Sequence, residues 1–191
     1  MALRSISTKP LVLAVVALAS CAHSGRKYHD GNMDFGSIKT VAVLPFQNVS
    51  KESSAADRVR DVFSNALLAT GSVYVLPPGE VARVISRTNV AMPSAPSIEE
   101  IVKVGGLLKA DALVTGFIKE YGEVRSSGGA VANVISVSLQ MIETSTGKVV
   151  WAGSTTKGGI SMMDRLLGSG GAPMDGVTEQ AVDDLLNQLF K

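Results

Sequence analysis

Residues 133–143 read NVISVSLQMIE, a stretch in which apolar residues alternate with serine and glutamine. Ile135, Val137, Leu139 and Met141 therefore fall on one side of an extended chain, and the polar residues fall on the other. This alternation predicts a β-strand with one buried face and one face that is exposed to water or covered by a helix. A sheet is thus expected at the centre of the domain.

Two further strands are predicted beside this stretch. ADALVTGFIKEYGEV (110–124) precedes it and KVVWAGSTTKGG (148–159) follows it, and both are rich in β-branched and aromatic residues. TSTGK (144–148) has the composition of a turn, in which Gly147 can adopt a positive φ. The three strands are expected to form a meander.

The residues before the meander predict a strand, a helix and a second strand. KTVAVLPF (39–46) is a short apolar run that ends near a proline, as in a buried strand. SSAADRVRDVFSNALLATG (53–71) has apolar residues at helical spacing, with Ser54 as the expected N-cap and Gly71 as the stop. VYVLPP (73–78) is the second strand.

Three more helices complete the expected order of elements. A short helix is predicted over residues 79–89, and Ser97 opens another through a capping-box pattern with Glu100. Gly105 and Gly106 should weaken the end of that helix. The last helix is expected over residues 177–190. The fold class is therefore α/β, with a mixed β-sheet of about five strands and helices packed on it.

The first 20 residues predict a secretory signal peptide. Arg4 and Lys9 precede an uncharged run over 11–19, and small residues follow at Ala19 and Ser20. The apolar run has roughly 9 residues, which is far below the ~20 that a membrane-spanning helix needs. We expect the segment to be removed.

Cys21 is the only cysteine of the chain. The sequence Leu18-Ala19-Ser20-Cys21 resembles the bacterial lipobox. This resemblance implies cleavage before Cys21 and acylation of both its thiol and the new amino terminus with chains such as palmitate. Two such chains anchor a protein stably. Because Ala22 is not the aspartate that signals inner-membrane retention, the resemblance implies an anchor in the outer membrane, with the protein facing the periplasm.

Other roles for Cys21 are less favoured. A disulfide within the chain is excluded, and a reactive thiol would need a folded, electropositive pocket. A buried free cysteine stays possible, but the next segment, AHSGRKYHDGNMDFGS (22–37), is polar and glycine-rich. The expected organisation is therefore a signal peptide over 1–20, a flexible tether over 21–37 and a single periplasmic domain over 38–191.

The composition favours a protein that is not an enzyme. Without the signal peptide the acidic and basic residues nearly balance, so no nucleic-acid partner is expected. Both histidines, His23 and His29, fall in the predicted tether, which leaves no histidine base or zinc ligand in the domain. The acidic pairs 99–100 and 183–184 should be solvated helix faces. We predict no cofactor, no metal and no small-molecule substrate; an envelope enzyme of unrecognised type is the alternative.

One stretch, GGISMMDRLLGSGGAPM (158–174), places methionines and leucines at helix-like spacing between two glycine clusters. It is either a short helix that caps the sheet or an adaptable surface that contacts a partner or another copy. The candidate partner-binding residues are Met162, Met163, Leu166 and Leu167.

Three segments resemble a known family in order and spacing. VAVLPFQNVS (41–50), KADALVTGFI (109–118) and VSLQMIETSTGKVVW (137–151) resemble the lipoproteins that include the penicillin-binding-protein activator LpoB and the curli secretion lipoprotein CsgG. The fold of that superfamily is similar to the N-terminal domain of TolB. The shared residues are sheet and turn residues, so the resemblance implies a scaffold rather than a site.

The length of the segments separates the roles in this superfamily. A curli-type subunit must donate spanning hairpins with strands of about 9 to 11 residues, and the interval 121–133 is too short for two of them. An activator must reach across the periplasm, for which a tether over 21–38 is short, at about 60 Å when fully extended. We therefore expect a protein-binding or scaffold module at the outer membrane, which binds other envelope proteins or further copies of itself. Its role would resemble that of a peptidoglycan-synthase activator or belong to envelope assembly. A curli-type subunit is the alternative.

Overall fold

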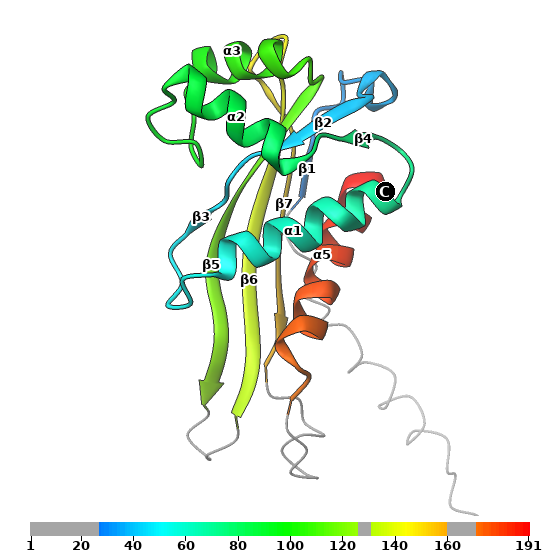
Figure 1. Ribbon diagram of the computed structural model, residues 1–191. Coiled ribbons are helices and arrows are strands. Elements are labelled where there is room, and N and C mark those ends of the chain that lie inside the picture. Colours follow the sequence, from blue (N-terminus) through cyan, green and yellow to red (C-terminus); the bar gives the residue numbers. More distant parts are fainter. Residues whose placement is uncertain (1–26, 126–130, 160–170) are drawn as a thin grey trace, which may run out of the picture.

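The computed structural model describes residues 27–125, 131–159 and 171–191. These residues form a mixed sheet with helices on both of its faces, which confirms the predicted α/β class (Figure 1). The sheet has seven strands rather than about five, in the order β1-β7-β6-β5-β2-β4, with β3 beside β5. The two extra strands are β1 (Lys27–His29) and β3 (Gln47–Asn48), which are too short to leave a side-chain pattern in the sequence.

The predicted meander forms the long part of the sheet. β5 (Ala112–Arg125), β6 (Val131–Glu143) and β7 (Val149–Gly158) pair antiparallel in chain order. The alternating apolar residues of β6 are almost fully buried, and the polar residues between them stay partly exposed. Gly147 has a φ of 68° in the turn before β7, as expected.

Three short strands join the β5 side of the sheet in parallel. β2 (Thr40–Val43) pairs with β5 and with β4 (Tyr74–Val75). The Asp111 carboxylate accepts hydrogen bonds from the backbone N–H groups of Lys39 (2.8 Å) and Thr40 (2.9 Å), which fixes the start of β2 against the start of β5. Beyond Pro45, β3 pairs with β5 further along the chain.

Two helical layers cover opposite faces of the sheet. Side chains of β2 alternate between two apolar clusters: Val41 and Val43 pack with α1 (Ala55–Ala69) and α5 (Met174–Phe190). Ala42 packs in the second cluster with α2 (Pro78–Thr88) and α3 (Ile98–Leu108). The α2–α3 layer lies at one end of the sheet, and β5, β6 and β7 extend well past it toward the other end (Figure 1).

The helix ends confirm part of the predictions. Ser97 and Glu100 form the predicted capping box. Hydrogen bonds from the backbone N–H groups of Ser97 (2.8 Å) and Ala91 (3.1 Å) lower the pKa of the Glu100 carboxyl below its ordinary value. Gly71 follows the end of α1 with a positive φ of 66°, as expected.

Ser54 stands at the N-cap position of α1 but does not cap the helix with its side chain. Its hydroxyl and its backbone N–H instead donate to Glu52 Oε1, at 2.8 and 3.2 Å. These two bonds lower the pKa of the Glu52 carboxyl. The predicted side-chain cap was therefore wrong: Ser54 has helical backbone angles (φ −86°, ψ −4°) rather than the extended conformation of a capping residue, and its hydroxyl donates to Glu52 instead of accepting from the first turn of the helix.

The start of the folded region also differs from the prediction. Residues 21–37 were expected as a tether, but β1 pairs antiparallel with β7 and a 3-10 helix follows over Phe35–Ser37. His29 therefore lies in the sheet and not in a tether. The strand escapes detection because Lys27 and Tyr28 are exposed, only His29 is partly buried, and the strand is held mainly by backbone pairing.

The two glycines of α3 provide a stability test. A Cβ on Gly105 would clash with the side chain of Thr144, whose hydroxyl donates to Ala110 O (2.6 Å) and Asp111 O (3.0 Å); a Cβ on Gly106 would meet open space. We expect Gly105→Ala to lower the free energy of unfolding by about 1 to 3 kcal/mol. Gly106→Ala should raise it by about 0.5 to 1 kcal/mol through helix propensity. Urea unfolding of both variants measures the difference, and effects of the same sign would contradict the packing.

Candidate functional site

The site residues predicted from the sequence lie outside the described residues. These are the lipidation site Cys21 and the contact residues Met162, Met163, Leu166 and Leu167. The structure therefore bears on them only through their described neighbours. Lys27 is the first described residue after Cys21, and Gly159 and Gly171 flank the segment with the four contact residues.

The chain enters the fold through a junction of β1, β7 and α5. The carbonyl oxygen of Gln188 accepts a hydrogen bond from His29 Nε2 at 2.7 Å and another from Trp151 Nε1 at 3.3 Å. A carbonyl can only accept, so the proton of a neutral His29 ring must sit on Nε2. Trp151 is fully buried at this point. The junction ties the first described strand to the last helix.

A second contact fixes α5 along β7. The Asp184 carboxylate accepts hydrogen bonds from Thr155 Oγ1 (2.6 Å) and Gln188 Nε2 (3.1 Å) and pairs with Lys157 Nζ at 3.3 Å. Partial burial on its own would raise the pKa of Asp184, but the hydrogen bonds from Thr155 and Lys157 and the charge of Lys157 outweigh it, so the pKa lies below its ordinary value. The expectation that Asp184 only faces solvent was wrong, because it holds a helix to the sheet.

The flanks of the methionine-rich segment meet at the start of β6. The backbone N–H of Gly159 donates to Asn133 O at 2.9 Å, and Asn133 Nδ2 donates to Ala172 O at 2.9 Å. Gly171 lies against Ala132, where a Cβ on the glycine would be tightly packed. Both ends of this segment are thus fixed at the end of the sheet that lies away from α3 (Figure 1).

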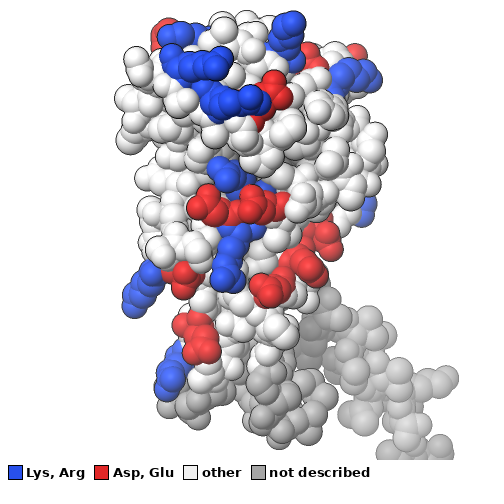
Figure 2. Space-filling view, viewed as in Figure 1, with Lys and Arg blue, Asp and Glu red and all other residues white. Residues whose placement is uncertain are grey.

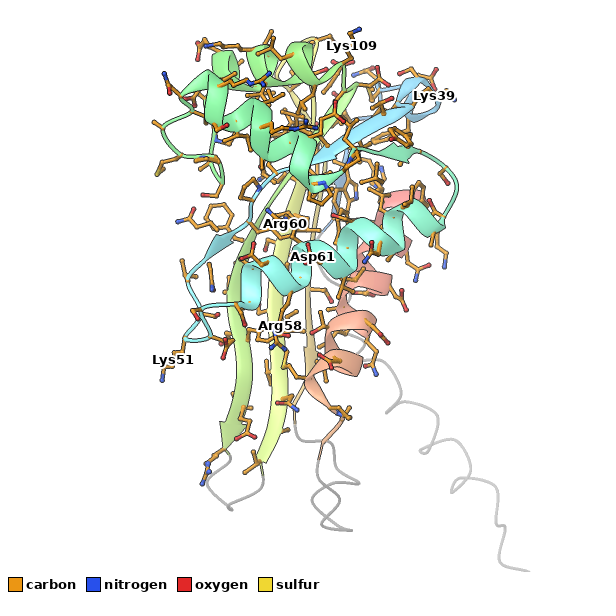
Figure 3. All side chains as sticks on the ribbon, viewed as in Figure 1. Lys39, Lys51, Arg58, Arg60, Asp61 and Lys109 are labelled. Atoms are coloured by element: carbon orange, nitrogen blue, oxygen red, sulfur yellow. The ribbon has the colours of Figure 1, made fainter. Side chains whose placement is uncertain are left out.

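A groove of about 540 Å³ runs beside the same part of the sheet. The loop after β3 lines one wall with Val49 and Lys51, and β5 and β6 line the other with Tyr121, Val124 and Val134. Figure 3 shows Lys51 at the tip of that loop, pointing away from the sheet. The charged residues of the groove have both signs, so it does not select an anion or a cation by charge.

Helix α3 carries an exposed apolar surface at the opposite end of the molecule from the groove. Ile98 and Leu107 are 60% and 58% exposed there, and Val102 is 43% exposed. Acidic and basic side chains are interspersed over the face of the molecule that carries α1, without a large patch of one sign (Figure 2). That face therefore has mixed charge, and α3 adds exposed apolar side chains at its end of the molecule.

The described part of the chain offers neither a metal centre nor a membrane span. No group of three or more histidine, cysteine, aspartate or glutamate side chains converges there in an arrangement that could hold a metal ion. Within the same residues, no helix combines the length and the apolar character that crossing a bilayer requires.

Several solved structures share this fold. The PelC dodecamer from Paraburkholderia phytofirmans aligns with a TM-score of 0.58 and 17% identity, over 86% of this chain and 95% of that one. Lipoprotein GNA1162 from Neisseria meningitidis gives 0.56 and 18%, over 79% and 97%. The hypothetical protein CT253 from Chlamydia trachomatis gives 0.53 and 14%, over 80% and 96%. At these identities the likeness supports the fold alone.

The sequence comparisons identify the family. No curated protein sequence matches the chain. The family described as peptidoglycan-synthase activator LpoB matches residues 24–156, which is more than half of the chain and reaches from the start of β1 into β7. This match confirms the resemblance carried by residues 41–50, 109–118 and 137–151. The chain therefore belongs to the LpoB family of peptidoglycan-synthase activators.

Proposed function

We propose that this protein is a regulator that is lipid-anchored in the outer membrane and faces the periplasm. It acts by binding other envelope proteins, without catalysing a reaction. The LpoB family, an activator family, supports the regulatory role. The lipobox-like sequence at Cys21 supports the anchor. The exposed valines on the walls of the groove, Val49 and Val124, and the exposed apolar side chains of α3 suit protein contacts.

The position of β1 carries the proposal. Only residues 22–26 separate Cys21 from Lys27, the first residue of β1, so this link spans at most about 20 Å. Lys27 pairs with Gly153, and β7 runs on from there to Gly158, a distance of about 17 Å. The link is therefore long enough to run from Lys27 to the end of the sheet at Gly158. Cys21 can lie at most a few Å beyond that end.

A domain with so short a link stays at the surface of its membrane. The anchor allows about a third of the reach that a tether over 21–38 would give. A partner in the inner membrane would therefore have to supply the reach across the periplasm itself. We propose that the partners of this domain are proteins of the outer membrane or proteins that extend to it.

The methionine-rich segment is the proposed partner contact in this arrangement. Its described flanks, Gly159 and Ala172, both lie at the end of the sheet that the link can reach. Met162, Met163, Leu166 and Leu167 would then contact proteins close to the membrane surface. Methionine side chains are adaptable and suit such contacts.

Self-association is the second candidate. PelC, which shares the fold over 86% of this chain, is described as a dodecamer. Copies that are anchored in one membrane are also concentrated, which favours contacts between them. A curli-type subunit would be a special case of this assembly.

The anchor is tested by changing Cys21. We expect Cys21→Ser to yield an unprocessed or soluble product, because the acyl acceptor is lost, and globomycin should block maturation of the wild type. Ala22→Ser should leave processing unchanged, whereas Ala22→Asp should move the protein to the inner-membrane fraction. Membrane fractionation and mass spectrometry of the mature amino terminus measure these outcomes. A wild-type protein with an unmodified Cys21 would refute the anchor.

The methionine-rich segment is tested by replacing Met163 and Leu166 with serine. If the segment contacts a partner, the double variant should keep its melting temperature and lose the proteins that crosslink to the wild type. If the side chains pack in the core, each truncation should cost about 2 to 5 kcal/mol.

Ile98→Ser with Val102→Ser is the control, because it removes apolar side chains from the exposed surface of α3 at the other end of the molecule. A large loss of stability in Met163→Ser with Leu166→Ser, together with unchanged crosslinked partners, would rule out the contact.

A further inference from the structure

The outer edge of β5 is unpaired along its last residues. β3 pairs with β5 at Phe117 and Ile118, and the last bond on this side joins Val49 N–H to Ile118 O at 3.0 Å. Beyond this bond, no strand of the described chain pairs with this side of residues 120–125, and β6 pairs with the other side over the whole interval. This part of β5 therefore lies at the outside of the sheet (Figure 1).

The register shows which backbone groups this edge presents. Asn133 O accepts a hydrogen bond from Gly159 and thus faces β7. Its partner across the ladder, Glu123, therefore points its N–H and C=O away from β6. By alternation Tyr121 does the same, whereas Gly122 between them faces β6. No group of the described residues bonds to the N–H of Tyr121 or Glu123, so the edge offers backbone donors and acceptors to a further strand.

The edge borders an empty space with apolar walls. The groove of about 540 Å³ lies between β5 and the loop after β3. Val49 on the loop and Val124 on β5 are 60% and 42% exposed, and Val134 lines the groove from β6. An unpaired edge binds an extended segment through backbone hydrogen bonds, and pockets for alternate side chains set the selectivity. Both parts of such a site are present here.

Gly122 leaves a gap in the wall of the groove. Its φ is 132°, a conformation that favours glycine, and a Cβ at this position would meet nothing within 4 Å. A glycine inside a strand often marks a place where another backbone approaches closely. An aromatic side chain from a neighbouring strand can cover such a glycine. A large apolar residue opposite Gly122 therefore fits the groove.

The charges along the groove cancel. Lys51, Lys119, Glu120 and Glu123 line it, and none of them takes part in an ion pair within the described residues. Charged side chains of both signs oppose indiscriminate pairing at the edge. They also favour a segment that carries little net charge over one that is strongly basic or acidic.

The segment that fits the groove has to come from another protein. Pairing at an edge requires a segment whose own backbone groups are free. All strands of the described chain already belong to its own sheet, so the described part of a second copy has no segment to donate.

We infer that residues 120–125 of β5 bind an extended segment of another envelope protein, which adds a strand to the sheet and places a large apolar side chain over Gly122. The inference rests on the proposed function of binding envelope proteins, and it adds the surface and the form of the partner.

Glu123→Pro tests the backbone contact, because it removes an outward N–H and no bond of the ladder with β6. Glu123→Ala is the matched control, since it removes the side chain and keeps the N–H. The probe is a phage-displayed library of random peptides, selected on the full-length lipidated protein in detergent. Selected peptides should bind the wild type and Glu123→Ala equally. They should bind Glu123→Pro roughly tenfold or more weakly, because a C=O of the peptide stays unpaired. Equal binding to both variants, or a selection that enriches no peptide, would overturn the inference.

N-methylated peptides keep the test valid if Glu123→Pro lowers the melting temperature. Methyl groups on alternate nitrogens block one edge of a peptide strand and leave the other edge free. One of the two alternating patterns should abolish binding to the wild type, and the other should be tolerated. Loss of binding with both patterns, or with neither, would rule out strand addition.

Hydrogen exchange at single amides tests whether the edge is open in the free protein. The amides of Tyr121 and Glu123 should exchange faster than those of Gly122 and Val124, which face β6, and a bound peptide should slow the first two. Slow exchange of Glu123 in the free protein would contradict the inference. If the slow rate depended on protein concentration, a second copy would occupy the edge; otherwise the chain would cover it itself.

Crosslinking of the same variants separates this inference from the function on which it rests. Envelope proteins that crosslink to the wild type should be retained by Glu123→Ala and lost from Glu123→Pro. If both variants retain them, the β5 edge is not the contact and the partner-binding function stands. If the wild type crosslinks to no envelope protein, the proposed function itself fails.

Discussion

The pairing of β1 with β7 is the contact on which the account of this protein depends. Residues 27–29 lie antiparallel to residues 151–153, and the Gln188 carbonyl receives hydrogen bonds from both His29 and Trp151. Because the first described strand is part of the sheet, the distance from Cys21 to the domain is set by five intervening residues. With the proposed anchor at Cys21, the reach of the domain and the end of the sheet that can meet the membrane follow from this pairing.

The sequence predicted the elements that side-chain patterns determine. The alternation in β6, the helical spacing of α1 and α5 and the capping box at Ser97 all appear in the structure. The elements that it missed depend on distant backbone partners: β1 has three residues, two of them exposed, and pairs with a strand more than a hundred residues later. Asp184 was misjudged for a similar reason, since Thr155 and Lys157 lie far from it in the sequence.

The family match and the shared fold describe a scaffold that close packing holds together. A Cβ on Gly116 would clash with Leu139, and Trp151 is fully buried against α5. Function is expected in the parts that this packing leaves free, which among the described residues include the groove beside β5 and the exposed surface of α3. The predicted site residues, Cys21 and the four methionines and leucines, stay predictions.

Neutron reflectometry of the lipidated protein on a supported bilayer tests the central claim most directly. It measures the distance between the lipid headgroups and the start of the protein density. The account predicts a protein layer whose density begins within about 20 Å of the headgroups, because the link from Cys21 to Lys27 can extend no further. A water layer thicker than that, with the folded domain held away from the bilayer, would contradict the account by showing that β1 does not stay in the sheet.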